Sequence, residues 1–167
     1  MNKMEENTVS REKQHYILIY LGGELFVINV KYVLRVLPAT SFTRVPQGPD
    51  FLKGVTNFNG NVLPVVDPYK KFKFLRKKKS SHKPLILVLN LNMGQKNTNL
   101  GLLVDDSNNV FEISPEEIKP YPAADTKYNT EYIDGVIERD GRFVLILDPE
   151  KLFAEETSFD FNETEKT

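Results

Sequence analysis

The chain has 167 residues and 40% hydrophobic residues, enough apolar material for one packed domain or two small lobes, which excludes a disordered chain. Its net charge of -1 gives no global reason to expect nucleic acid or an anionic membrane as the partner. The absence of cysteine excludes disulfides, thiolate metal sites and a cysteine nucleophile.

The N-terminal residues 1–14 mix acids and bases and lack the apolar core of a signal peptide, so we expect a flexible tail. The sequence contains no apolar run near the roughly 18 residues of a membrane span. These two observations favour a cytoplasmic protein. Strands are expected at YILIYL (16–21) and LFVINV (25–30), on either side of a turn at Gly22-Gly23.

The segment 30–37 has apolar residues at helical spacing, but it is rich in valine. The pattern fits a helix and equally a short helical turn that passes into a strand.

Residues 54–72, GVTNFNGNVLPVVDPYKKF, return at 135–153 as GVIERDGRFVLILDPEKLF, with seven of nineteen positions identical and no gap. Asn59-Gly60 and Asp140-Gly141 each predict a tight hairpin, because these dipeptides tolerate positive φ. The arms after the turns are almost continuously apolar and predict buried strands. Pro64 cannot donate to a ladder, so its strand is the better candidate for a sheet edge or a bulge.

Each copy continues into Asp-Pro, which is typical of a helix start. Asp67 and Asp148 are predicted to cap short helices, with Phe72 and Phe153 packing back onto the strands. Ser114, followed by proline and by Glu117, predicts a third capped helix.

The second half begins with LILVLNL (85–91) and reaches LGLLV (100–104) through NMGQKNTN, which we expect to be an exposed polar loop. The tail 154–167 carries five acids against one lysine, and we expect it to be disordered. Short strands, Gly and Pro punctuation and the repeat favour an all-β chain of paired small barrels or a sandwich, with a few short helices.

The ordered series FTRVP, FLKGVTNFNGNVLPVVD, GLLVDDSNNV, SPEEIKP and EYIDGVIERDGRFVLILDPEKLF resembles the CheW family of bacterial chemotaxis adaptors. The resemblance covers residues 15–153 as a single CheW-like domain with repeat units of about 16–72 and 85–153, whose strands could interleave between lobes. It implies two five-stranded SH3-like β-barrels on a shared core, without catalysis or a cofactor. It also implies a scaffold of a two-component system, monomeric alone and recruited to membrane-associated receptor arrays. Its partners would be the regulatory domain of a CheA-like histidine kinase and the cytoplasmic helical hairpin of a chemoreceptor.

The resemblance also suggests where partners bind. Family members often carry a glutamate where this chain has Arg35, and an arginine where it has Asn59. These changes place the receptor surface in question, and a diverged scaffold that binds the kinase but not ordinary receptors is the alternative. The residues expected at the receptor or kinase surface are Val33, Arg35, Val36, Asn59, Val104 and Val110. The glycines expected to meet turn or close-approach demands are Gly54, Gly60, Gly101, Gly135 and Gly141.

Catalytic and metal sites are not expected. Asp67 and Asp148 could be imagined as a carboxylate pair, but capping engages their oxygens and neither lies in an Asp-Thr/Ser-Gly loop. His15 and His82 have no ligand at metal spacing, and Ser80-Ser81-His82 lacks an orienting acid.

Residues 70–83, KKFKFLRKKKSSHK, contain eight Lys or Arg and no acid. A solvated loop explains them, while an acidic protein partner or RNA stays open. A small nucleic-acid-binding β-barrel that uses this loop is therefore the hypothesis from another class.

Overall fold

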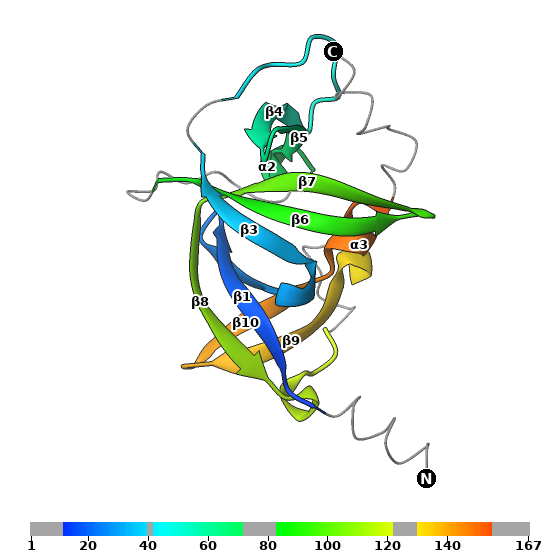
Figure 1. The fold of residues 1–167 in the computed structure, drawn as a ribbon. Helices are drawn as coiled ribbons and strands as arrows, with labels where there is room; N and C mark the ends of the chain where they lie inside the picture. The colour runs from blue at the N-terminus through cyan, green and yellow to red at the C-terminus, as the bar shows by residue number, and fades with distance from the viewer. Residues whose placement is uncertain (1–11, 40–41, 72–82, 122–129, 155–167) are drawn as a thin grey trace.

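The computed structural model describes residues 12–39, 42–71, 83–121 and 130–154. In these residues, ten strands form two five-stranded sheets joined by short helical turns (Figure 1). The strands are β1 (Gln14–Leu21), β2 (Glu24–Asn29), β3 (Val33–Pro38), β4 (Leu52–Phe58), β5 (Asn61–Val66), β6 (Leu85–Met93), β7 (Lys96–Val104), β8 (Asp106–Ile113), β9 (Ile133–Arg139) and β10 (Arg142–Leu147). The helical turns are η1 (Val30–Tyr32), α2 (Pro68–Lys71), η2 (Pro115–Glu117), η4 (Thr130–Tyr132) and α3 (Pro149–Leu152). The all-β prediction is confirmed.

The two sheets are copies of one topology. Sheet A has the order β8-β1-β2-β10-β9, and sheet B has the order β3-β6-β7-β5-β4. The two orders are the same when β1 to β5 are exchanged with β6 to β10, so that β1 corresponds to β6 and β2 to β7. Each sheet therefore combines strands from both halves of the chain, because β1 and β2 join the sheet of the second half while β6 and β7 join that of the first.

Within the described part of the chain, three clusters of buried residues make up the core. One takes residues from all five strands of sheet A, and another, with its half-buried neighbours, from all five strands of sheet B, so each sheet curls around its own interior. The third lies between the sheets and joins Ile19 and Phe26 of sheet A to Leu89 and Leu100 of sheet B. The two lobes therefore share a core, as predicted.

The alternation along a strand explains why the apolar runs are nearly continuous. In β10, Val144 and Ile146 face the interior of sheet A, whereas Leu145 and Leu147 face the shared core. Successive side chains point to opposite faces of a sheet, so a strand buried on both faces needs apolar residues at every position.

The predicted hairpins are present in both copies. Asn59 and Asp140 have φ of 52° and 51°, and the following Gly60 and Gly141 have φ of 82° and 75°. Two successive residues with positive φ are what a type I′ turn requires, and its twist matches that of the flanking strands.

The Asp-Pro segments lie at helix starts. Asp67 Oδ1 accepts a hydrogen bond from the backbone N–H of Tyr69 at 2.9 Å, and Asp148 Oδ1 accepts one from Glu150 N–H at 2.9 Å. Each carboxylate thus satisfies an N–H group that the first helical turn leaves without a partner.

The third capped turn is η2. Ser114 donates its backbone N–H to the Glu117 carboxylate at 2.8 Å, which is the reciprocal contact of a capping box. Phe153 is fully buried in the shared core, whereas Phe72 lies outside the described residues.

Of the two alternatives for residues 30–37, the structure shows the second, a short helical turn that passes into a strand. Asn29 Oδ1 accepts a hydrogen bond from Lys31 N–H at 2.9 Å and caps the single 3-10 turn η1. The chain then enters β3, consistent with the strand preference of its valines.

The polar segment NMGQKNTN is not a long loop, which corrects the expectation from sequence. β6 and β7 pair as far as Met93 and Lys96, with Gly94 at φ 76° in the turn. Leu91 and Thr98 pair and are both buried, whereas the exposed neighbours alternate with them. Asparagine and lysine are depleted in strands, so the composition of this segment predicted a loop. The strand forms because its side chains pair with those of the neighbouring strand.

Of the two alternatives for Pro64, the sheet edge is wrong, whereas a register shift between Leu52 and Gly54 of β4 does lie close to the proline. β5 lies between β7 and β4, and Pro64 is opposite Val55. The registered pairing with β7 involves only Val65 and Val66, so the proline lies just before this ladder begins. An inner strand can therefore accommodate a residue that lacks an N–H group.

Candidate functional site

Two of the four outer strands of the sheets are covered along one edge. Thr43 forms a bridge to Val55 of β4, and Lys119 forms the equivalent bridge to Val136 of β9. Among the described strands, β3 pairs only with β6, and β8 pairs only with β1. The edges of β3 and β8 therefore present backbone groups to which another element can bind.

These two edges also carry exposed apolar side chains. Leu34 and Val36 of β3 are 52% and 37% exposed, and Val110 of β8 is 52% exposed. Val36 lies opposite Leu87 and Val110 opposite Ile17, and both of these partners belong to the shared core. The β3 edge and the β8 edge are thus equivalent surfaces in which apolar contact and backbone pairing are available together.

Arg35 lies in the centre of the β3 edge. The register shifts between Val33 and Arg35, so the strand bulges there, and the Arg35 side chain is exposed while Val33 packs against the shared core. Asn59 is exposed in the β4–β5 turn. No ion pair or hydrogen bond joins Arg35 to Asn59 within the described residues, and β3 and β4 are at opposite ends of the strand order.

Val104 does not belong to this surface, which corrects the expectation from sequence. Its side chain is 1% exposed and packs in the shared core at the end of β7. Burial against the other lobe leaves it no contact area for a partner.

The glycines divide into two groups. Gly60 and Gly141 are in the hairpin turns, where an added Cβ would meet no atom within 4 Å. At Gly54, Gly101 and Gly135, an added Cβ would come within 2.6 Å of another residue. These three glycines permit close packing, and at Gly54 and Gly135 the close neighbour is the segment that covers the outer strand.

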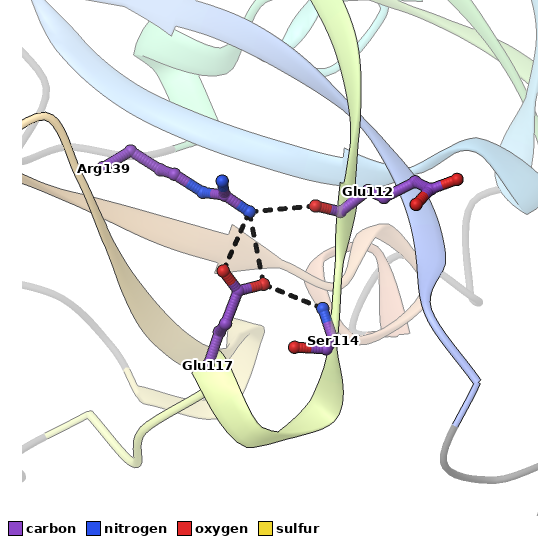
Figure 2. Close-up of polar contacts among 4 residues, drawn as sticks. All are labelled: Glu112, Ser114, Glu117 and Arg139. Carbon is purple, nitrogen blue, oxygen red and sulfur yellow. Dashed lines mark hydrogen bonds and ion pairs between the residues drawn. The ribbon is translucent and has the colours of Figure 1, made fainter.

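The gap between β8 and β9 is bridged by one arginine. Arg139 of β9 donates from Nη2 to the backbone carbonyl of Glu112 in β8 at 2.9 Å and pairs with the Glu117 carboxylate at 3.1 Å (Figure 2). Its guanidinium carbon lies 5.0 Å from the ring centroid of Phe111. Arg139 therefore joins the two outer strands of sheet A and holds the β8 edge in place.

Polar contacts also join the lobes. Tyr69 of α2, which follows a strand of sheet B, donates its hydroxyl to Asp105, and Gly22 in the β1–β2 turn donates its N–H to both the Tyr69 hydroxyl and Asp105 Oδ2 at 2.7 Å. Burial, together with the hydrogen bond to Asp105, raises the pKa of Tyr69. Glu150 of α3 makes the reciprocal contact by accepting the Asn92 N–H of β6 at 2.6 Å.

The described residues contain no group of three or more His, Cys, Asp or Glu able to hold a metal ion. His15 lies opposite Glu112 in the β1–β8 ladder, and its Nε2 is 3.3 Å from Glu112 Oε1. His82 and Ser80-Ser81 lie outside the described residues. Asp67 and Asp148 cap separate helices, which leaves no paired-carboxylate site between them.

Sequence reasoning missed Leu34, the more exposed apolar neighbour of Arg35, and the closing residue Arg139. Leu34 fits the helical spacing of residues 30–37, and that spacing does not show which side chains a strand would leave exposed. Arg139 is next to a turn dipeptide and lies 27 positions from Glu112, and no local pattern predicts such a contact.

Comparison with known proteins agrees with this architecture. A family model described as a CheW-like domain matches residues 15–157. Chemotaxis protein CheW of Klebsiella aerogenes is 31% identical over 156 residues, which cover 93% of this chain and 89% of that protein, and CheW of Treponema pallidum is 24% identical over 149 residues, which cover 87% and 85%. The crystal structure of scaffolding protein TtCheW from Thermoanaerobacter tengcongensis superimposes with a TM-score of 0.73 at 27% identity and covers 85% of this chain and 88% of that one. In the part of the chain that the structure describes, no helix is long and apolar enough to cross a membrane.

Proposed function

The chain belongs to the CheW-like domain family, and on that premise we propose that it is a non-enzymatic chemotaxis adaptor that couples a CheA-type histidine kinase to chemoreceptor tips. The observation that carries the proposal is the pair of outer strands β3 and β8, each of which pairs with one described strand only and carries exposed apolar side chains, Leu34 and Val36 on β3 and Val110 on β8. On β8, Arg139 engages the Glu112 carbonyl, so a partner would pair with the strand beyond that residue. Two such surfaces allow one protein to hold two partners at the same time. The adaptor is monomeric alone and cytoplasmic, and it joins membrane-associated arrays by binding the receptor.

We assign the receptor hairpin to the β3 edge and the kinase regulatory domain to the β8 edge. An amphipathic helix can place aliphatic side chains against Leu34 and Val36, while a β-domain can pair with the backbone of β8 next to Val110. Arg35 is next to Val36 in sequence but lies opposite Val88, on the other face of the strand, so we expect it to border the receptor contact, where a carboxylate of the partner would complement it.

Isothermal titration of each purified partner against the full chain tests this assignment. Val36→Asp places a carboxylate in the receptor contact and is expected to weaken receptor binding at least tenfold while kinase binding stays unchanged. Val110→Asp is expected to do the reverse. Asn57→Asp, at an exposed position of the covered strand β4, is the control and should alter neither affinity. Equal affinities for wild type and both variants would contradict the proposed surfaces.

The alternative within the same family is a scaffold that binds the kinase but not ordinary receptors. The exposed Arg35 and the uncharged Asn59 favour it, because family members often carry the opposite charge at the first position and an arginine at the second. Arg35→Glu together with Asn59→Arg restores the usual residues. Receptor binding by this double variant but not by the wild type would establish the alternative, whereas binding by the wild type would exclude it.

A further inference from the structure

The loop between β3 and β4 forms one wall of an open depression on sheet B, with the start of α2 opposite. The depression has a volume of about 610 Å³ and includes none of the residues of the β3 edge or the β8 edge. It therefore lies apart from both surfaces assigned to the adaptor function.

Backbone hydrogen bonds hold this wall. Gly48 N–H donates to the Val45 carbonyl at 3.3 Å, and Leu52 N–H donates to the Pro49 carbonyl at 3.0 Å. The other wall is tied to the loop because Asp67 N–H donates to the Phe51 carbonyl at 2.7 Å. The hollow is thus a feature of the folded chain, built on fixed turns.

Among the described residues, three cations line the depression, Arg44, Lys53 and Lys70. All three side chains are exposed, and within the described residues none of them takes part in an ion pair. Two carboxylates, Asp50 and Asp67, share the lining, and Asp67 already caps α2. Among the residues that the structure describes, no ion-pair partner neutralises these three cations.

We propose that this depression is a docking site for an extended acidic peptide segment of a partner protein. Its three cations complement the carboxylates of such a peptide. Its apolar lining residues, Val45 and Leu52 among them, can contact apolar side chains that lie between the acidic residues of the peptide. A nucleic acid fits less well, because its uniform row of phosphates would lie against Asp50 and Asp67. The site goes beyond the adaptor function and does not depend on it.

Fluorescence anisotropy with a labelled peptide of about ten residues, rich in Glu and with interspersed Leu, tests the proposal at about 150 mM salt, where exposed long-range attraction is screened. A second peptide with Gln in place of Glu measures binding that does not depend on charge. We expect the Glu peptide to bind at least tenfold more tightly than the Gln peptide.

Variants locate the binding. Arg44→Glu with Lys53→Glu is expected to weaken the Glu peptide at least tenfold, whereas the control Lys31→Glu with Lys96→Glu, which makes the same change in net charge at exposed positions elsewhere, is expected to change affinity less than about twofold. Circular dichroism confirms that each variant is folded. Equal losses in both double variants would mean attraction to overall charge and would overturn the proposal. So would no preference for Glu over Gln, or a single-stranded oligonucleotide that binds more tightly than the Glu peptide.

Discussion

Gly54 and Gly135 are 81 positions apart and perform the same task in the two lobes. A Cβ at Gly54 would lie 2.6 Å from the Thr43 carbonyl oxygen, and one at Gly135 would lie 2.9 Å from that of Lys119. The chain covers β4 and β9 so closely at these points that only glycine fits.

Gly54→Ala is therefore expected to lower the free energy of unfolding by about 2 kcal/mol, as overpacking against backbone does. Gly60→Ala is the control, because its Cβ meets nothing and only its positive φ costs about 1 kcal/mol. Urea denaturation of both variants measures the difference. A smaller loss for Gly54→Ala than for Gly60→Ala would mean that the Thr43 segment gives way.

Tyr69 makes the free energy of unfolding depend on pH in the alkaline range. Burial and Asp105 raise its pKa in the folded chain above the ordinary tyrosine value of about 10. Above about pH 10 the unfolded chain has released this proton while the folded chain retains it, so the free energy of unfolding falls as pH rises. The contribution is complete below about pH 10 and is lost as pH rises toward the folded pKa.

Tyr69→Phe is expected to reduce this alkaline decline and to cost about 1 kcal/mol at pH 7, through the lost hydrogen bond to Asp105. The decline that remains comes in part from Tyr32, since burial and nearby Asp148 and Glu150 raise its pKa to about 12. Urea midpoints between pH 7 and pH 11 measure both effects. Parallel pH profiles for wild type and variant would rule out Tyr69 as the source.

The two outer strands of sheet A, β8 and β9, are connected by the side chain of Arg139. Arg139 bonds to the Glu112 carbonyl and to Glu117 while its guanidinium stacks over Phe111. Partly exposed ion pairs contribute little, so most of the effect should be local ordering of β8 and β9.

Arg139→Met keeps an unbranched apolar stem and removes these polar contacts. We expect a loss of about 1 kcal/mol in unfolding free energy, and faster amide hydrogen exchange in β8 and β9 than in β6 and β7. Arg142→Met, an exposed position in the same hairpin, is the control and should leave exchange unchanged. Uniform acceleration across both sheets would contradict a local closing role.

Local sequence patterns predicted most of the strands and turns. The pairing of strands between the two lobes came only from the resemblance to a known family. The Asn-Gly and Asp-Gly turns and the apolar arms of the repeat each depend on residues close in sequence, so they were visible. The extension of β7 through Thr98 was hidden, because only its partner Leu91 places that threonine in the core. At the surface, Val36 and Val110 are exposed, and their role in binding stays a prediction. Val104 is buried because β7 is covered by the shared core, which only the other lobe completes, and no local pattern shows this.

The exchange of strands makes each half of the chain dependent on the other. In sheet A, β1 and β2 of the first half lie between β8 and β10 of the second half. In sheet B, β6 and β7 of the second half lie between β3 and β5 of the first half. The shared core also takes residues from both sheets. Neither half can bury its apolar strands alone, so the two lobes should unfold in one cooperative transition.

Cutting the chain between residues 82 and 83 tests this dependence, because the cut breaks the connection between β5 and β6 and leaves every strand whole. Fragments 1–82 and 83–167 should each give poorly dispersed amide spectra when alone, since each loses the partners of its strands. Mixed in equal amounts, they should recover the dispersed spectrum of the intact chain, because the missing strand pairs and the shared core form again between fragments. A dispersed spectrum from either fragment alone would mean that one half can close its own sheet, and the two lobes would then be independent units joined by contact.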